Sequence, residues 1–368
     1  MEFYVNGAKT DTLPVKDSGQ YWSGGTSFGY SVNSVPEYYW DGYLQERLES
    51  AKPSYTNGKS FIWISDVHLL DNACKSKYLI PDIMKRLNID KVVFTGDIIT
   101  TYGTQEDMDR QIEEWNDFVN CIGRDKIYCG QGNHDLCIQY VDDERNPLYK
   151  GYGAPISEIN DTLMGDMIRA NKISYVDTEH QYYSWEDDDM LYIMLNSFEC
   201  INPGSGWLDP SNTRHTPAIY QEQINWLIDL LLNSTKKIVM FSHQTWVPSL
   251  HENGNGYYPY MNNLISAYTG RTSVSYESDT VSFNADFSGC TGELICVFTG
   301  HVHGDEGNNS NGCANISITA DAMYGSGQTK GTVSEQAFDI VNIDYDKKVI
   351  WLYRIGWYGN FHNRRIGF

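Results

Sequence analysis

Gly132-Asn133-His134-Asp135 places an amide, an imidazole and a carboxylate side by side, directly after the short apolar run at residues 126–129. The apolar run predicts a strand, and open α/β sheets carry their ligand-binding groups just beyond the carboxyl ends of the strands. A tetrapeptide of this kind is more often an ordinary loop when it stands alone. Its meaning therefore depends on how the other predicted strands end.

Four other predicted strands alternate with helical segments along the chain. The strands cover about residues 61–64, 91–95, 237–241 and 293–299, and the helices between them cover about residues 74–88, 104–122 and 217–232. We also expect helices near 40–51, 155–170 and 260–269, and hairpins within 181–196 and 337–355. Strands that alternate with helices indicate a layered α/β domain.

Each of the five strands ends in one or more potential metal ligands. In chain order these are Asp66 and His68, Asp97, Asn133 and His134, His243, and His301 and His303. Five of the nine histidines lie at these ends. For any one of them a structural role is the commoner outcome, but coincidence is a poor explanation for all five together. We therefore expect the strand ends to form one shared site.

The spacing within two of these stretches adds to the prediction. In an extended segment, Asp66-Val67-His68 and His301-Val302-His303 would each turn both polar side chains to the same side. Each pair could then hold one ion. Imidazole, carboxylate and amide ligands together suit manganese, iron, zinc or cobalt better than calcium or an iron–sulfur cluster. Seven of these eight residues would already be enough ligands for two ions and too many for one.

Composition narrows the class of protein. The formal net charge of −21 over 368 residues opposes binding along extended duplex nucleic acid. The eight cysteines form no Cys-x-x-Cys pair, so neither a thiolate zinc site nor a redox motif is indicated. No run of 18 apolar residues and no secretory signal pattern is present. We therefore expect a cytoplasmic protein that does not associate with a membrane.

Residues 1–57 differ from the rest of the chain. They are rich in glycine, serine and aromatic residues, and we expect them to be an N-terminal extension whose rings pack on a main domain at 58–368. An aromatic binding platform is the alternative. A second unusual region, 244–290, reads as a long loop around one short helix. Its Tyr257, Tyr258 and Tyr260 could stack on a base or sugar or pack against the extension.

The ordered set of motifs resembles the calcineurin-like metallophosphoesterase superfamily. The pattern D-x-H, G-D, G-N-H-D, H and G-H-x-H occurs in the family's order over about residues 59–320. The resemblance implies an α/β fold, a four-layer αββα sandwich of two mixed β-sheets flanked by helices, closed by the final hairpin with Arg354-Ile355-Gly356. Thr100 stands where the family often has an acidic residue, and Ser242 where it often has glycine.

The resemblance also assigns roles to the residues at the strand ends. It makes Asp97 a bridge between two ions, whose ligands are Asp66, His68, Asp97 and His303 for one, and Asp97, Asn133, His243 and His301 for the other. It leaves His134 to stabilise the transition state or protonate the leaving oxygen, and Asp135 to orient the His134 ring. Two cations about 3.5 to 4 Å apart can clamp a phosphoryl group and acidify a bridging water.

The resulting prediction is a metal-dependent phosphoesterase, a phosphatase or phosphodiesterase, that acts on a small phosphorylated substrate. It would hydrolyse a phosphomonoester or phosphodiester by attack of a metal-bridging hydroxide, with manganese as the favoured metal. One alternative is a scaffold or binding protein that keeps the fold without the chemistry, although such a protein would be expected to lose ligands. Another is a nuclease acting on short oligonucleotides.

Overall fold

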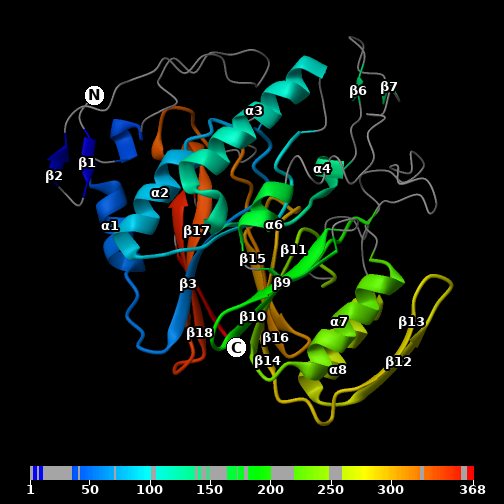
Figure 1. Cartoon of the computed structure of the whole chain (residues 1–368). Coiled ribbons are helices and arrows are strands. Elements are labelled where there is room, and N and C mark those ends of the chain that lie inside the picture. Colours follow the sequence, from blue (N-terminus) through cyan, green and yellow to red (C-terminus); the bar gives the residue numbers. More distant parts are fainter. Residues whose placement is uncertain are drawn as a thin grey trace.

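Two β-sheets lie face to face at the centre of the protein, and helices cover the outer face of each sheet (Figure 1). The predicted four-layer αββα sandwich of two mixed sheets is therefore confirmed. The computed structural model describes residues 3–5, 8–10, 35–39, 42–69, 72–100, 105–136, 140–141, 147–148, 164–171, 173–177, 181–199, 219–247, 259–323, 327–357 and 363–368.

The first large sheet has six strands in the order β19-β18-β17-β3-β4-β5. Its parallel half consists of β3 (Gly58–Ile64), β4 (Val92–Phe94) and β5 (Ile127–Cys129). Its antiparallel half consists of β17 (Ala337–Asp344), β18 (Val349–Gly356) and β19 (Asn363–Gly367). The hairpin of β17 and β18 was predicted, whereas β19 was not.

The second large sheet has seven strands in the order β15-β16-β14-β11-β10-β9-β8. The parallel strands are β16 (Cys313–Ser317), β14 (Glu293–Thr299), β11 (Lys237–Ser242) and β10 (Met190–Met194). The antiparallel strands are β15 (Glu306–Ser310), β9 (Tyr182–Glu186) and β8 (Ile173–Asp177). The predicted hairpin within 181–196 is therefore confirmed as β9 and β10, while β8, β15 and β16 are additional strands.

Separate groups of helices cover the two sheets (Figure 1). Helices α1 (Tyr43–Ala51), α2 (Ser76–Leu87) and α3 (Gln105–Ile122) share one core with the six-stranded sheet. Helices α7 (Gln221–Asn233) and α8 (Pro259–Gly270) share another with the seven-stranded sheet and with a hairpin of β12 (Ser273–Glu277) and β13 (Ser282–Asp286).

The remaining described elements are short. They are β1 (Phe3–Val5) with β2 (Ala8–Thr10), β6 (Tyr140–Val141) with β7 (Pro147–Leu148), α4 (Asn133–Leu136), α6 (Asp166–Ala170), and 3-10 turns at Glu37–Tyr39, Arg124–Lys126 and Val333–Glu335. Among the residues that the structure describes, no helix combines the length and apolar character needed to cross a bilayer.

The interface between the sheets explains why the central strands read as unbroken apolar runs. The ring of Phe61 on β3 meets Phe241 on β11 and Phe298 on β14 edge-on, at centroid distances of 5.7 and 5.5 Å. Trp63 meets Phe298 at 4.7 Å. Each of these strands is covered on both faces, so no alternation of polar and apolar residues survives. This packing holds the carboxyl ends of β3, β11 and β14 close together.

Two expectations about local structure were wrong. The helix predicted from residue 217 begins at Gln221, because Tyr220 has an extended backbone; Pro217 lies outside the described residues. The long loop expected at 244–290 contains the β12–β13 hairpin. Tyr260 packs on that hairpin, 5.8 Å from the Tyr276 ring, and donates to the carbonyl of Ile219 at 3.1 Å. The two roles considered for Tyr260 stay predictions, and residues 257 and 258 are outside the described part.

Two described segments of residues 1–57, at 35–39 and 42–51, join the main core. Tyr39, Leu44 and Leu48 are buried in the same cluster as the apolar residues of α2, α3 and the six-stranded sheet. Tyr43 accepts a hydrogen bond from the backbone N–H of Gly356 at 2.7 Å. The domain boundary at 57/58 stays a prediction. Only the part of the predicted 155–170 helix that forms α6 falls within the described residues.

Candidate metal centre

The ends of five parallel strands place their polar residues at one point between the two sheets. Strands β3, β4 and β5 of the six-stranded sheet contribute some of these residues, and strands β11 and β14 of the seven-stranded sheet contribute the others. All seven residues predicted as metal ligands lie there, together with His134 and Asp135. The shared site inferred from the strand ends is thus a feature of the fold.

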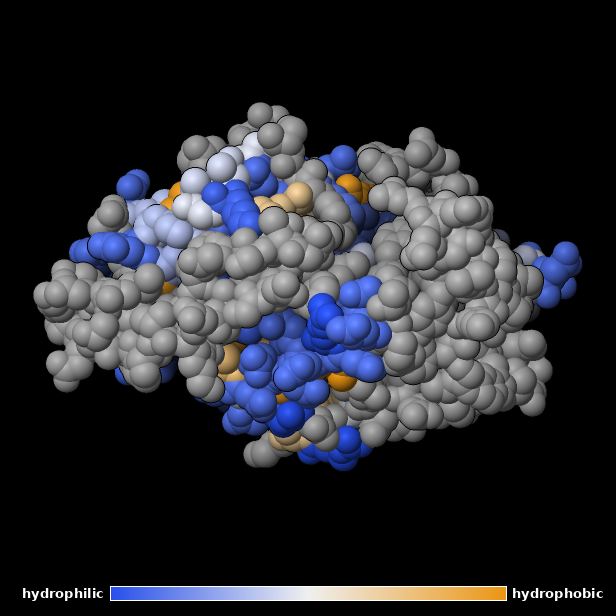
Figure 2. All heavy atoms as spheres, turned by 90° about the horizontal axis from the view of Figure 1, so that it is seen from above, coloured by the Kyte–Doolittle hydropathy of each residue, from blue (hydrophilic) through white to orange (hydrophobic). Residues whose placement is uncertain are grey.

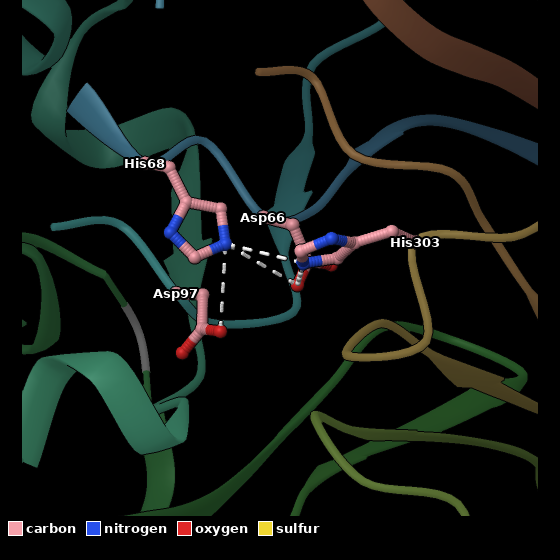
Figure 3. Close-up of side chains that lie close together, drawn as sticks. All are labelled: Asp66, His68, Asp97 and His303. Atoms are coloured by element: carbon pink, nitrogen blue, oxygen red, sulfur yellow. Dashed lines mark hydrogen bonds and ion pairs between the residues drawn. The ribbon is translucent and has the colours of Figure 1, made fainter. Parts of the chain in front are cut away.

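The first group of side chains contains Asp66, His68, Asp97 and His303, whose ligand atoms all lie within 4.8 Å of one another (Figure 3). Nε2 of His68 is 3.2 Å from Nε2 of His303 and 3.6 Å from Oδ2 of Asp97. Nε2 of His303 is 3.2 Å from Oδ1 of Asp66. These atoms converge on a single point, as the ligands of one ion do.

The second group contains Asp97, His243 and His301, again with ligand atoms within 4.8 Å. Nε2 of His243 lies 3.1 Å from Oδ2 of Asp97. The side-chain oxygen of Asn133 is 3.1 Å from Nε2 of His243 and 2.9 Å from Nδ1 of His301, so it belongs to this group as well. Asp97 is common to both groups.

The chemistry of these side chains fits a pair of cations. Burial, reinforced for His301 by His243, lowers the pKa of His68 to about 4 and that of His301 to about 3, so both rings are neutral near pH 7 and keep a lone pair. Burial raises the pKa of Asp66, but the imidazoles of His243 and His303 outweigh it and lower that pKa to about 2. Two buried carboxylates together with imidazole nitrogens and an amide oxygen suit borderline divalent metals.

The backbone at the ligands has an unusual conformation. Asp66, His68, Asp97, His301 and His303 have φ between +42° and +69°, and they are five of the eleven non-glycine residues with positive φ in the described part of the chain. Such residues cluster at functional sites because the surrounding structure must hold them in place. Here the N–H of Asp66 donates to Gly96 O and that of His68 to Asp97 O, both at 3.0 Å.

This geometry corrects one step of the sequence argument. Asp66-Val67-His68 and His301-Val302-His303 lie beyond the ends of β3 and β14 and are not extended, since their polar residues are left-handed. Asp66 and His68 still point into one group, but His301 and His303 fall into different groups. The expectation that each pair holds one ion is therefore wrong for the second pair. The division of ligands implied by the family resemblance agrees with the observed grouping.

Gly132 is required by a close approach. A Cβ atom at Gly132 would overlap Oδ1 and the backbone nitrogen of Asp97. Gly132 does not have positive φ, in contrast to Gly96, whose φ is +95°. The same constraint recurs at Gly300, where a Cβ would overlap the side chains of Ser65 and Asp66. Because neither glycine has a side chain, Asp97 can approach Gly132 closely, and Ser65 and Asp66 can approach Gly300 closely.

His134 lies at the edge of the first group. Its ring meets that of His68 edge-on, with centroids 4.7 Å apart, and it remains partly exposed. The backbone N–H of His134 donates to Oδ1 of Asp97 at 2.8 Å, which leaves Oδ2 as the atom nearest to His68 and His243. Among the described residues, His134 is outside both groups of potential ligands.

Asp135 contacts the backbone of two ligand loops. Its Oδ1 accepts the N–H groups of Ile98 and Ile99 at 2.8 and 3.1 Å, and its Oδ2 accepts the N–H of Gly132 at 2.8 Å. These bonds join the turn after β4 to the turn after β5. The role of Asp135 in orienting the His134 ring stays a prediction.

Two further residues support the site and were not identified from the sequence. Phe198 is fully buried, and its ring lies 5.8 Å from that of His243 and 5.6 Å from that of His301. Gln111 on α3 accepts the N–H of Thr100 at 2.6 Å and donates to the Thr100 carbonyl at 3.1 Å. Gln111 thus holds the loop at the position where the family often has an acidic residue.

The orientation of His243 has a visible cause. Its Nδ1 donates to the carbonyl of Thr95 at 2.7 Å, which points Nε2 toward Asp97. A hydrogen bond of this kind selects the nitrogen that faces a metal. Burial lowers the pKa of His243, but the carboxylates of Asp97 and Asp66 outweigh it and raise that pKa to about 9.

Solved structures of other proteins resemble this fold. A dimetal phosphatase from Danio rerio is similar in structure, at 12% identity over 84% of this chain and 98% of that chain, with a TM-score of 0.53. Purple acid phosphatase PPD1 from seeds of yellow lupin (Lupinus luteus) matches at 12% identity over 86% of this chain and 55% of that chain, with a TM-score of 0.48. A search of curated protein sequences found no significant match.

The family comparison covers the region that carries the site. The sequence model described as calcineurin-like phosphoesterase matches residues 59–305, which include all the ligands at the five strand ends. This match spans more than half of the 368 residues. The chain therefore belongs to the calcineurin-like phosphoesterase family.

Proposed function

We propose that the protein is a metal-dependent hydrolase that cleaves a small phosphomonoester or phosphodiester with the help of two divalent ions. Manganese is the preferred metal for both positions. The observation that carries this proposal is the sharing of Asp97 between two groups of converging ligands. A single shared carboxylate keeps two cations about 3.5 to 4 Å apart, the separation at which two-metal sites act on phosphate esters.

When bound, such a pair of ions would lower the pKa of a water molecule and neutralise negative charge on the attacking and leaving oxygens. The residues of the chain prepare the site for this chemistry. Asp66 and Asp97 supply two buried negative charges, and neutral His68 and His301 each keep a lone pair. Because these groups are already in place, little reorganisation is needed when the substrate binds.

His134 supplies the group that faces the substrate. The backbone N–H of His134 donates to Asp97, and its ring packs edge-on against the ring of His68. The imidazole is therefore held next to the first group of ligands. From this position the ring can donate a proton or a hydrogen bond to the leaving oxygen.

The hydropathy of one face and the net charge bear on the choice of substrate. Figure 2 looks down on the protein from above the view of Figure 1, and the described residues near the middle of this face are mostly hydrophilic. The net charge of −21 disfavours long duplex nucleic acid but not a small phosphorylated molecule or a short oligonucleotide.

The test combines metal content with turnover. Purified protein loaded with manganese should hold about two ions per chain and cleave p-nitrophenyl phosphate or bis-p-nitrophenyl phosphate. The His134→Ala variant should lose about 100-fold or more in kcat, as expected for a general acid, and should keep both ions. Loss of metal in this variant would show that His134 is a ligand instead.

The same measurements distinguish the alternatives. A wild-type protein that holds no transition metal after loading would favour a binding protein with this fold. A panel of sugar phosphates, nucleotides, phosphodiesters and short oligonucleotides would then identify the substrate class of an active protein, including a nuclease.

A further inference from the structure

Four charged side chains form a buried cluster that includes Asp305, two residues after the predicted ligand His303. They are Asp305, Asp339, Arg354 and Arg364, with side-chain exposures of 7%, 1%, 2% and 10%. Arg354 donates from Nη1 and Nη2 to the two oxygens of Asp305 at 2.9 and 2.6 Å, and from Nε to Asp339 at 2.7 Å. Forked pairing of this kind fixes the relative positions of both partners.

The cluster connects to His303 through two short paths. Asp305 follows His303 by two residues, and its Oδ1 accepts the N–H of Thr319 at 3.1 Å. The hydroxyl of Thr319 in turn donates to the carbonyl of His303 at 3.1 Å. The hydroxyl of Ser317 donates to the carbonyl of Gly304 at 3.0 Å. Each of the three residues from His303 to Asp305 thus accepts a hydrogen bond from Thr319 or Ser317.

Arg364 links this cluster to both sheets. Its Nη2 donates to Asp339 at 2.9 Å and lies 3.4 Å from Asp305. Its Nη1 donates to the carbonyls of Ser317 at 2.7 Å and Glu306 at 3.1 Å, which belong to β16 and β15 of the seven-stranded sheet. Arg364 itself lies on β19, the edge strand of the six-stranded sheet. One guanidinium therefore joins the two sheets beside the ligand turn.

His303 needs such support more than its neighbours do. Its side chain is 33% exposed, whereas those of Asp66, His68 and Asp97 are at most 1% exposed. It also has a left-handed backbone, with φ of +49°. The ring of His303 is therefore packed less completely than these three side chains, and a strained backbone persists only where other contacts determine it.

We infer that Arg364, carried by strand β19, is a positioning residue for His303 and so for the ion of the first ligand group. The inference rests on the proposed function, because it concerns retention of a metal at that site. It assigns a role in the metal centre to a strand that lies outside the region matched by the family model, which ends at residue 305.

Arg365 supplies a matched control on the same strand. It carries the same charge, but its guanidinium lies 5.5 Å above the ring of Trp351. The Arg364→Met and Arg365→Met variants therefore make the same chemical change next to each other, one with and one without contact to the cluster. Thr319→Val is a second probe, because it removes the bond to the His303 carbonyl without changing any charge.

The experiment measures manganese binding by the full-length protein with titration calorimetry and elemental analysis. We expect Arg364→Met to bind one ion about 10- to 100-fold more weakly, the usual effect of removing a group that supports a ligand, and to keep the other ion. Arg365→Met should match wild type, and Thr319→Val should weaken the same ion. The thermal unfolding of each metal-free variant separates loss of stability from loss of affinity.

The outcomes are distinct. If wild type holds two ions and both Arg364→Met and Thr319→Val bind them with wild-type affinity, the inference fails and the proposed function stands. If Arg364→Met does not fold, wild-type binding by Thr319→Val alone overturns the inference. If Arg365→Met weakens the ion as much as Arg364→Met, the effect is general and the inference fails. A wild-type protein without metal would remove the proposed function and this inference together.

Discussion

Oδ2 of Asp97 lies 3.1 Å from Nε2 of His243, and the two residues follow strands that belong to different sheets. Asp97 follows β4 of the six-stranded sheet, and His243 follows β11 of the seven-stranded sheet. The candidate metal centre is therefore built across the sheet–sheet interface, and its geometry depends on how the two sheets pack.

Replacing Asp97 should affect both ions at once. Its Oδ2 is near His68 in one group and His243 in the other, so Asp97→Asn removes a ligand charge from each. We expect manganese content to fall from about two ions to less than one and kcat/KM to fall by more than about 100-fold. Asp90→Asn, at a largely exposed position, should leave both unchanged. Retention of two ions by Asp97→Asn would contradict the bridging role.

Metal affinity should rise with pH up to about 9. The pKa of His243 is raised to about 9 by Asp97 and Asp66 against the effect of burial, so without metal its ring is protonated at pH 7. A protonated imidazole cannot bind a metal, and ion binding must release that proton. The affinity should therefore increase up to tenfold per pH unit below 9 and level off above it. His68 and His301, already neutral, should release none.

Proton release can be measured directly. Titration calorimetry of manganese at pH 7 in buffers with different ionisation enthalpies should give close to one proton released as the second ligand group fills. A value near zero would show that the ring of His243 is neutral before the metal binds.

Asp135→Asn should separate two roles for this carboxylate. Its oxygens accept three backbone N–H groups from the loops after β4 and β5, and an amide retains only one acceptor oxygen. If these bonds matter most, the variant should lose metal affinity, and its free energy of unfolding in urea should fall by about 1 to 3 kcal/mol. If the predicted contact with His134 dominates, metal content should be unchanged while the pH profile of kcat shifts.

Gln111→Leu should weaken the loop that carries Thr100. The variant leaves the N–H and carbonyl of Thr100 without their buried partner, which costs about 1 to 3 kcal/mol for each unsatisfied group. We expect a lower free energy of unfolding in urea and weaker manganese binding. The exposed Gln45 on α1 offers a control, since Gln45→Leu should change the free energy of unfolding by less than about 0.5 kcal/mol and leave manganese binding unchanged. Equal effects of the two changes would argue against a specific role for Gln111.

The positions of the ligands could be predicted because the central strands are buried on both faces. Runs such as Phe61-Ile62-Trp63-Ile64 contain no polar residue, so the first polar residues after them mark the sheet edge. Chain order then indicated which polar residues share a site. The same reasoning failed for the separate placement of His301 and His303, because a left-handed backbone breaks the alternation of an extended segment.

Other features left little trace in the sequence. Gln111 and Phe198 act through distant backbone and ring contacts that no local pattern encodes. Strand β19 alternates exposed with partly buried residues, three of its five residues are polar, and Arg364 reads as a surface cation although it joins two sheets. The β12–β13 hairpin did carry a signal, since Val274, Tyr276, Phe283 and Ala285 alternate with polar residues and pack on α7 and α8.

The pairing of β17 with β3 has a consequence for biosynthesis. Asp339 pairs with Trp63, so the strand that leads to the first ligands is completed on one side only by residues made some 270 positions later. Every predicted metal ligand is translated before that partner exists. We expect the nascent chain to expose an unpaired edge of β3 during this interval, and metal uptake to follow the synthesis of β17.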